Sequence, residues 1–175
     1  NAVEGAFVTL GAGVYNLTDN VTVNNKPVQV KEGEVVINGQ GHKITSGSDG
    51  NYAIITQGEK GSLTMNADLV ANGGGYAVTD GSNLTIVGGS VHVQTQYKNG
   101  GRYCLYLEGV GSVATINGGT FSFDTSISTR RAYIYASAGT TVYVKGGTFG
   151  KPSTRDNYKA GIMGDGTVIV TGGTF

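Results

Sequence analysis

The chain has 175 residues, including 31 glycines, 2 prolines and 1 cysteine, and its formal net charge at pH 7 is zero. This length suits one domain, the single cysteine excludes a disulfide framework, and no apolar run approaches the roughly 20 residues of a membrane span. Residues 1–80 carry eight acidic side chains against four lysines, whereas residues 81–175 carry eight basic side chains against four acidic ones. One half is therefore acidic and the other basic, and this asymmetry concerns association with partners rather than the fold.

The N-terminal part, residues 7–30, alternates apolar and polar residues in short runs that are typical of strands. We expect an N-terminal cap and a first coil within residues 1–33, and repeated coils over residues 34–175. A coil here means one turn of a solenoid. The chain begins with Asn1 and ends at Phe175 within a repeat, so we expect a processed product or part of a longer polypeptide whose coils continue or are capped beyond Phe175.

Short apolar segments, expected to be strands, open the successive coils that follow at residues 52–55, 76–78, 103–107, 132–135 and 160–163. Cys104 lies in the third of these segments. A cysteine in an apolar strand is expected to be a buried free thiol rather than a nucleophile, because only two histidines are available as partners.

A sequence ending in Gly-Gly-Thr-Phe recurs at residues 115–121, 142–149 and 168–175. The apolar residue two places before the Gly-Gly pair recurs every 21 to 30 residues, counting looser copies, at Ile37, Met65, Ile86, Ile116, Val144 and Val170. A period in the twenties is typical of a solenoid in which each coil buries its apolar face against its neighbours. We expect these residues to form one inward column, and Phe121, Phe149 and Phe175 to stack on one another.

Strand-like alternation in every repeat predicts an all-β fold, a right-handed parallel β-helix of about six coils with an N-terminal cap. Leucine-rich repeats have a similar period, but their Leu-x-x-Leu-x-Leu pattern is absent from this chain. A sandwich or meander would need hairpin turns between antiparallel neighbours, whereas like strands here are separated by a full coil.

Residues 37–44 read Ile-Asn-Gly-Gln-Gly-His-Lys-Ile. This segment resembles the opening coil of pectate-lyase-like β-helix proteins. Together with Gly13-Val-Tyr and the Gly-Gly-Thr-Phe repeats, it also resembles repeat-bearing surface and virion proteins of gut bacteria and their phages. The resemblance implies a β-helix and a location outside the cell, on a virion or a bacterial surface.

Catalytic members of the resembled family imply paired aspartates, a Gly-His-Gly motif or a calcium-binding acidic cluster. Here Gly41-His42-Lys43 lacks the second glycine, and the acidic residues are scattered singly. We therefore interpret His42 as a residue that stabilises a turn. We expect no catalytic residue, no metal ion and no cofactor.

Three insertions, at residues 94–102, 122–131 and 150–159, separate one coil from the next. Insertions at equivalent places in a solenoid emerge on one side, which is often its binding face. They hold seven bases against Asp124 and Asp156, with two tyrosines among them. The binding residues we expect are Tyr97, Lys98, Arg102, Arg130, Arg131, Lys151, Arg155, Tyr158 and Lys159.

Three function classes remain open. We expect a non-enzymatic structural or attachment protein of an extracellular assembly, first a phage virion-surface fibre or capsid-decoration protein. The alternative is a bacterial cell-surface adhesin or glycan-binding module, and a polysaccharide lyase or hydrolase comes third. The expected partners are further copies of the chain, capsid or tail proteins, or anionic glycans, and neither nucleic acid nor a membrane span is expected. The sequence leaves the host, the ligand and the oligomeric state open.

Overall fold

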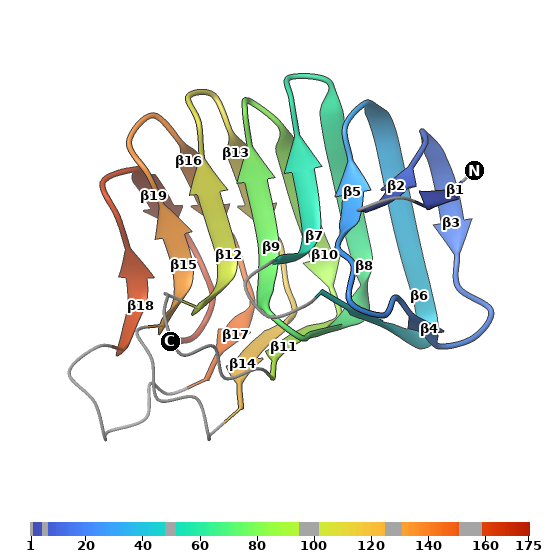
Figure 1. Ribbon diagram of the computed structural model, residues 1–175. Coiled ribbons are helices and arrows are strands. Elements are labelled where there is room, and N and C mark those ends of the chain that lie inside the picture. Colours follow the sequence, from blue (N-terminus) through green and yellow to red (C-terminus); the bar gives the residue numbers. More distant parts are fainter. Residues whose placement is uncertain (1, 5–6, 48–51, 95–101, 125–130, 151–158) are drawn as a thin grey trace.

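The computed structural model describes residues 2–4, 7–47, 52–94, 102–124, 131–150 and 159–175. All of the elements in these residues are strands, which wind into a parallel β-solenoid of about five turns (Figure 1). The predicted fold class is confirmed, and the expected number of coils, about six, was slightly too high. Two sheets form the walls of the solenoid, and the chain passes from one to the other in each coil.

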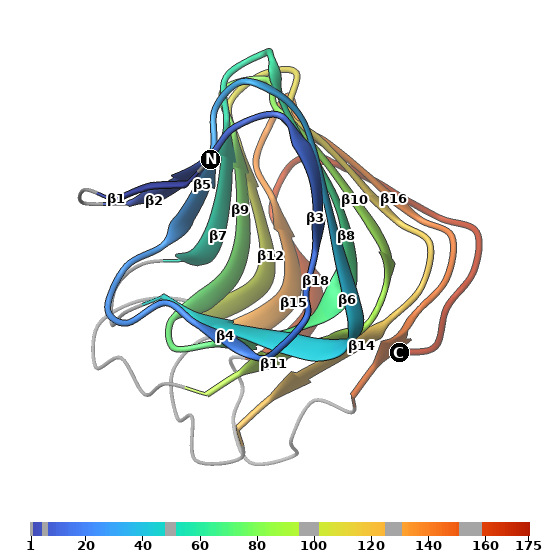
Figure 2. The same cartoon turned by 90° about the vertical axis from the view of Figure 1, so that its right-hand side faces the viewer.

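The first sheet faces the viewer in Figure 1 and runs in the order β1-β2-β5-β7-β9-β12-β15-β18. All the apolar segments expected to open coils lie in its strands. Its neighbours pair in parallel apart from the antiparallel hairpin of β1 and β2, which projects from the body of the solenoid (Figure 2). The strands are β1 (Ala2–Glu4), β2 (Val8–Leu10), β5 (Val28–Val30), β7 (Tyr52–Gln57), β9 (Gly74–Thr79), β12 (Arg102–Glu108), β15 (Arg131–Ala136) and β18 (Lys159–Met163).

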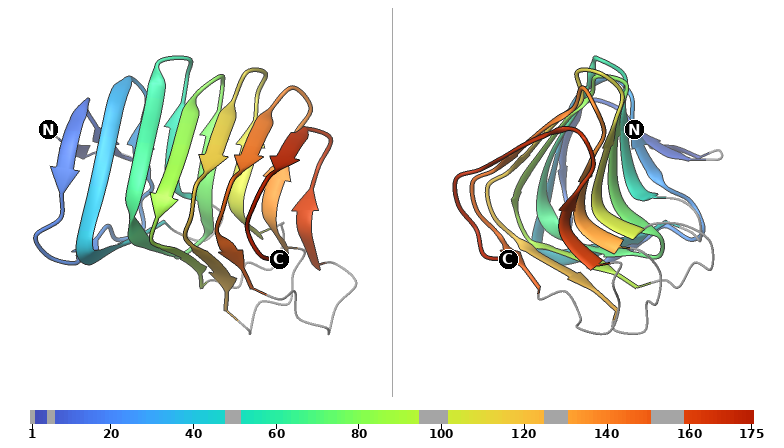
Figure 3. Two further views of the ribbon diagram at one scale, coloured as in Figure 1. Left: turned by 180° about the vertical axis from the view of Figure 1, so that it is seen from behind. Right: turned by 90° about the vertical axis from the view of Figure 1, so that its left-hand side faces the viewer.

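The second sheet forms the opposite wall (Figure 3, left). Its strands β6 and β8 are long, and each continues around a corner that later coils make with two shorter strands. The strands are β3 (Gly13–Asn16), β4 (Val21–Thr22), β6 (Gly33–Ser46), β8 (Gly61–Ala71), β10 (Asn83–Gly88), β11 (Ser90–Val93), β13 (Val113–Ile116), β14 (Thr120–Phe123), β16 (Thr141–Val144), β17 (Thr148–Phe149) and β19 (Thr167–Val170).

The predicted inward column is confirmed by the strand register. Successive partners are Ile37, Met65, Ile86, Ile116, Val144 and Val170. All of these residues are buried except Val170, which is 48% exposed because it lies in the last coil of the described chain. The column is thus the apolar spine of the core, and each of its members depends on the coil next to it for burial.

The three phenylalanines of the repeat stack as predicted. The ring centroids of Phe121 and Phe149 are 4.6 Å apart, and those of Phe149 and Phe175 are 4.4 Å apart, with interplanar angles of 9° and 6°. The Gly-Gly pair makes this possible at the corner before each ring. Gly147 has φ of +102°, a value that favours glycine, and a Cβ on Gly146 would collide with the carbonyl oxygen of Asn117.

The strands of the first sheet bend near their beginning, where two successive residues both face the core. Ala53 and Ile54 form such a pair in β7, Cys104 and Leu105 in β12, and Tyr133 and Ile134 in β15. The residues on either side of each pair consequently face outward. Cys104 is confirmed as a buried free thiol, and burial raises its pKa.

Candidate functional site

Four tyrosines gather on the outer surface of the first sheet. We call Tyr52, Tyr103, Tyr106 and Tyr135 the tyrosine face. The ring of Tyr106 is central: its centroid lies 5.2 Å from that of Tyr52, 5.7 Å from that of Tyr103 and 5.1 Å from that of Tyr135. Tyr103 and Tyr135 also meet, at 4.9 Å. One continuous aromatic cluster therefore spans the outer surface from β7 to β15.

Small residues at neighbouring register positions make room for these rings. Tyr52 pairs with Gly74, and a Cβ at Gly74 would collide with Cδ1 and Cε1 of the Tyr52 ring, so this ring lies over the glycine. Ala77 pairs with Tyr106, and Ala132 pairs with Tyr103. The Tyr52 ring can therefore reach across β9 to stack on Tyr106, which is two strands away.

Polar groups border the tyrosine face where its strands end. The Tyr106 hydroxyl donates a hydrogen bond of 3.0 Å to Oε2 of Glu108. The pKa of Tyr106 is raised to about 12, mainly by burial and also by the hydrogen bond to Glu108. Beside this pair, Nε2 of Gln29 donates to Oε1 of Gln57, and Nε2 of Gln57 donates to Oδ2 of Asp80, both over 3.0 Å.

Three basic residues share one register position where the strands of this sheet begin. Arg102 of β12 pairs with Arg131 of β15, which in turn pairs with Lys159 of β18. We call these three residues the basic row. Neighbouring strands are about 4.8 Å apart, so the row places one basic residue on each of three successive coils. Arg102 directly precedes Tyr103 in the sequence, so the backbone of the basic row adjoins the backbone that carries the tyrosine face.

The basic row contains three of the nine residues that the sequence predicts to bind a partner. The register brings these three together at one edge of the sheet. The other six, whose binding role likewise stays a prediction, lie outside the described residues: Tyr97, Lys98, Arg130, Lys151, Arg155 and Tyr158.

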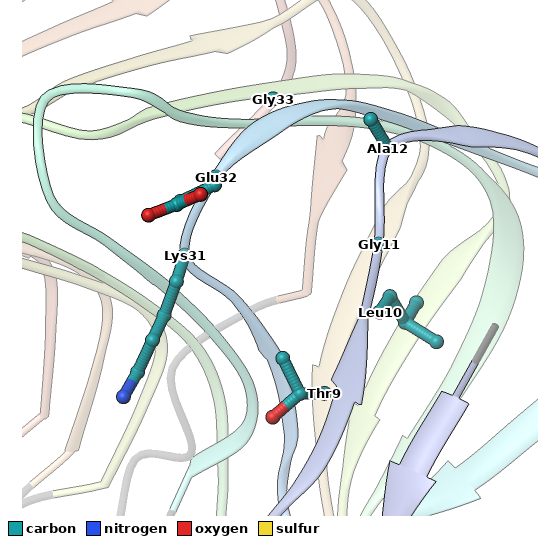
Figure 4. A pocket seen from close by; sticks show the side chains of 7 residues that line it. All are labelled: Thr9, Leu10, Gly11, Ala12, Lys31, Glu32 and Gly33. Carbon is teal, nitrogen blue, oxygen red and sulfur yellow. The ribbon is translucent and has the colours of Figure 1, made fainter.

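Two surface concavities lie elsewhere. One, of about 560 Å³, is bounded by the ends of β2 and β5 and is lined by Thr9, Leu10, Gly11, Ala12, Lys31, Glu32 and Gly33 (Figure 4). Its lining is mainly backbone and small side chains, and Lys31 and Glu32 are its two charged members. The side chains of Lys31 and Glu32 extend in different directions, so the concavity offers no convergent set of polar groups (Figure 4).

The second concavity, of about 350 Å³, lies at the corner of β6 and β8 and contains His42 and Asp68. Oδ1 of Asp68 accepts hydrogen bonds from the backbone N–H of Ser90 at 2.7 Å and from its hydroxyl at 2.9 Å. This carboxylate therefore holds the backbone and side chain of Ser90 in the neighbouring coil in place.

Among the described residues, no group of three or more histidine, cysteine, aspartate or glutamate side chains could hold a metal ion.

Comparison with protein-family models, curated proteins and solved structures finds no match to this chain. The described residues also contain no helix that could span a membrane. The candidate site must therefore be interpreted from the residues that form it and from their contacts.

Sequence reasoning did not identify the tyrosine face. It assigned these residues to apolar strands that open successive coils, which is correct, but gave their rings no role. The available signal was the recurrence of tyrosine in four of those five strands. This signal is weak, because Tyr76 and Tyr133 lie in the same set of strands and their side chains belong to the core.

Proposed function

We propose that this chain is a non-enzymatic structural and attachment module of an extracellular assembly. The observation that carries the proposal is the tyrosine face on the outer surface of a regular solenoid, together with three basic residues at one register position where the strands of the same sheet begin. Tyrosine and arginine, with tryptophan, are enriched among the residues that contribute most to binding energy at protein interfaces. A contact surface on the side of a rigid solenoid suits attachment to a partner.

The regular architecture supports the structural part of the proposal. Each described coil stacks on the next through parallel hydrogen bonding in both sheets, and the core forms one apolar column. Such a solenoid extends by adding coils without changing its cross-section. It can therefore act as a spacer that holds a contact surface at a set distance from its base.

Among possible assemblies, we place a phage virion-surface fibre or capsid-decoration protein first. The likeness of the Gly-Gly-Thr-Phe repeats to repeat-bearing surface and virion proteins supports this choice. A bacterial cell-surface adhesin or glycan-binding module is the alternative, and the tyrosine face favours it equally, because both roles require a contact surface outside the cell.

Attachment can be tested with fluorescent beads that carry the purified protein and are incubated with a panel of gut bacteria. Replacing the basic row, by Arg102→Gln, Arg131→Gln and Lys159→Gln, should reduce bead attachment, and added salt should reduce attachment by the unmodified protein. The matched control removes three exposed lysines elsewhere, by Lys31→Gln, Lys43→Gln and Lys60→Gln. Equal attachment by both triple variants, each shown to be folded, would contradict the proposal.

The enzyme alternative has its own assay. Incubation with pectin, alginate and bacterial capsular polysaccharide should release neither unsaturated nor reducing ends above the level of a boiled sample. Release that disappears in an Asp68→Asn variant would instead identify the concavity containing His42 as a catalytic site.

A further inference from the structure

We propose that the tyrosine face binds a basic polypeptide segment, whose arginine and lysine side chains contact the rings and the carboxylates of Asp80 and Glu108. This inference rests on the proposed attachment function and adds the chemistry of the partner and the described residues that contact it. The observations that lead to it concern the extent of the exposed apolar surface, the hydrogen-bonding groups that remain available there, and the charge of the surface.

The exposed rings belong to a longer apolar row on the outer surface of the first sheet. Ile55, Ala77, Tyr106, Tyr135 and Met163 are successive register partners from β7 to β18, and all except Ala77 are partly exposed. With neighbouring strands about 4.8 Å apart, the row is about 19 Å long, which an extended segment of about six residues can cover. Contiguous exposed apolar surface commonly marks an interaction site.

The polar groups beside this row offer mainly acceptors to a ligand, because several of their donors are already used. The Tyr106 hydroxyl donates its only proton to Oε2 of Glu108, and Nε2 of Gln57 donates to Oδ2 of Asp80. The other carboxylate oxygens of Glu108 and Asp80, and the lone pairs of the Tyr106 hydroxyl, remain as acceptors. Arginine and lysine side chains carry only donors, so they complement this set, whereas acidic groups carry only acceptors and do not.

The same carboxylates give this surface a negative charge. Asp80 and Glu108 are exposed, and neither forms a salt bridge within the described part of the chain. Glu108 pairs with Thr79, the residue before Asp80, so the two carboxylates lie on adjacent coils, where like charges repel each other. A bound cation offsets this repulsion and gains charge-assisted hydrogen bonds, which are about twice as strong as neutral ones. A basic partner is therefore favoured over a neutral sugar chain, which is the competing occupant.

The rings add a preference for arginine over lysine. A guanidinium group is planar, stacks on aromatic rings and can bind a carboxylate through two parallel hydrogen bonds. Tyr106 and Glu108 are two residues apart on the same outer side of β12 and are hydrogen-bonded to each other. One arginine side chain can therefore contact a ring and a carboxylate together.

The test measures binding of the purified protein to labelled peptides by fluorescence anisotropy. The probe is a peptide of about eight residues in which arginine alternates with serine, and peptides with glutamine or glutamate in place of arginine are the comparisons. The arginine peptide should bind, and its affinity should fall as salt is added. Asp80→Asn combined with Glu108→Gln keeps the shape of both side chains and removes their charge, so it should weaken this binding about five- to tenfold.

The matched control for the carboxylate variant is Asp19→Asn combined with Glu34→Gln, which removes two exposed acids on the other wall of the solenoid and should leave binding unchanged. The rings are tested by Tyr135→Thr, which should weaken binding about two- to fivefold. Its control is Tyr143→Thr, because Tyr143 is a 37% exposed tyrosine on the outer surface of the second sheet. Circular dichroism and thermal unfolding establish that each variant is folded. The carboxylate variant changes only exposed side chains, so it decides the question if Tyr135→Thr fails to fold.

The inference is overturned if the arginine peptide does not bind, if the glutamine peptide binds equally well, or if the folded carboxylate variant keeps full binding. Displacement of the arginine peptide by neutral dextran would also overturn it, in favour of a sugar ligand. The attachment proposal is judged separately by the bead assay. If beads attach to bacteria and the arginine peptide does not bind, the attachment function stands and this inference fails. If the peptide binds with the expected variant effects and no beads attach, the binding site stands and the attachment proposal fails.

Discussion

The solenoid contains two stacks of aromatic rings that share one geometry and differ in surroundings. Phe121, Phe149 and Phe175 stack at the corners of successive coils at centroid distances of 4.6 and 4.4 Å, and the first two rings are buried inside the solenoid. Tyr52, Tyr106 and Tyr135 stack on the outer surface of the first sheet at 5.2 and 5.1 Å. In both cases the parallel register of the stacked coils brings the rings together.

The difference teaches how one repeat geometry serves two purposes. The phenylalanine rings occupy the same position of a recurring motif, and burial explains the presence of Phe121 and Phe149, whereas Phe175, in the last described coil, is 45% exposed. The tyrosine rings come from positions that are not all equivalent, since Tyr52 reaches Tyr106 across Gly74. Removing a ring from the inner stack should therefore affect mainly folding, and removing one from the outer stack should affect mainly binding.

The largest effect is expected from Phe149→Ala. This ring is 2% exposed and lies between two other rings, so its loss leaves a cavity and should lower the free energy of unfolding by about 3–5 kcal/mol. Tyr135→Ala should cost clearly less, because part of that ring is already in water. Urea denaturation of both variants makes the comparison, and a change within about half a kcal/mol for Phe149→Ala would show that its ring is exposed.

A smaller effect is expected from Gly74→Val, which tests whether the outer stack depends on the glycine beneath it. The new Cβ would collide with the Tyr52 ring, and such overpacking should cost about 1–3 kcal/mol. The cost should shrink in a Tyr52→Ala background, which a double-mutant cycle would measure. Additive effects of the two changes would mean that the Tyr52 ring does not rest on Gly74.

Tyr76→Phe should have an effect of opposite sign. The Tyr76 side chain belongs to the core, and its buried hydroxyl has no hydrogen-bond partner. Removing it relieves the desolvation penalty of an unsatisfied polar group, so the variant should be as stable as the unmodified protein or more stable by about 1 kcal/mol. Marked destabilisation in thermal unfolding would indicate that the hydroxyl has a partner, such as a buried water molecule.

The smallest effect is the loss of folding stability expected at alkaline pH, as Tyr106 ionises. The pKa of Tyr106 is raised from an ordinary value of 10 to about 12, so the folded protein holds this proton more tightly than the unfolded chain. The resulting stabilisation is fully present below pH 10 and is lost as the pH rises from 10 to 12. Ultraviolet titration should show one fewer late-ionising tyrosine in Tyr106→Phe. The same late ionisation in both proteins would assign the shift to another tyrosine.

Much of the fold follows from the sequence alone, because the signals that predict it are local. The Gly-Gly-Thr-Phe repeat defines the period and the corner, and two-residue alternation places Ile86, Ile116 and Val144 on the inner side. The stacking of the three phenylalanines follows from the same period. The grouping of the basic insertions at one edge stays a prediction, because most of these residues lie outside the described ranges, and the register places only the backbone of Arg102, Arg131 and Lys159 side by side.

The tertiary structure alone decided which tyrosines face the solvent. Tyr52-Ala-Ile and Tyr76-Ala-Val look equivalent, yet Tyr52 lies on the outer surface and Tyr76 in the core. The register pairs Tyr52 with Gly74 and Ile54 with Tyr76, a shift of two residues that similarity between the segments cannot reveal. The two successive inward residues in each of these strands also break the alternation on which sequence reasoning depends. Pairing between neighbouring coils fixes both features, and that pairing exists only once the coils are stacked.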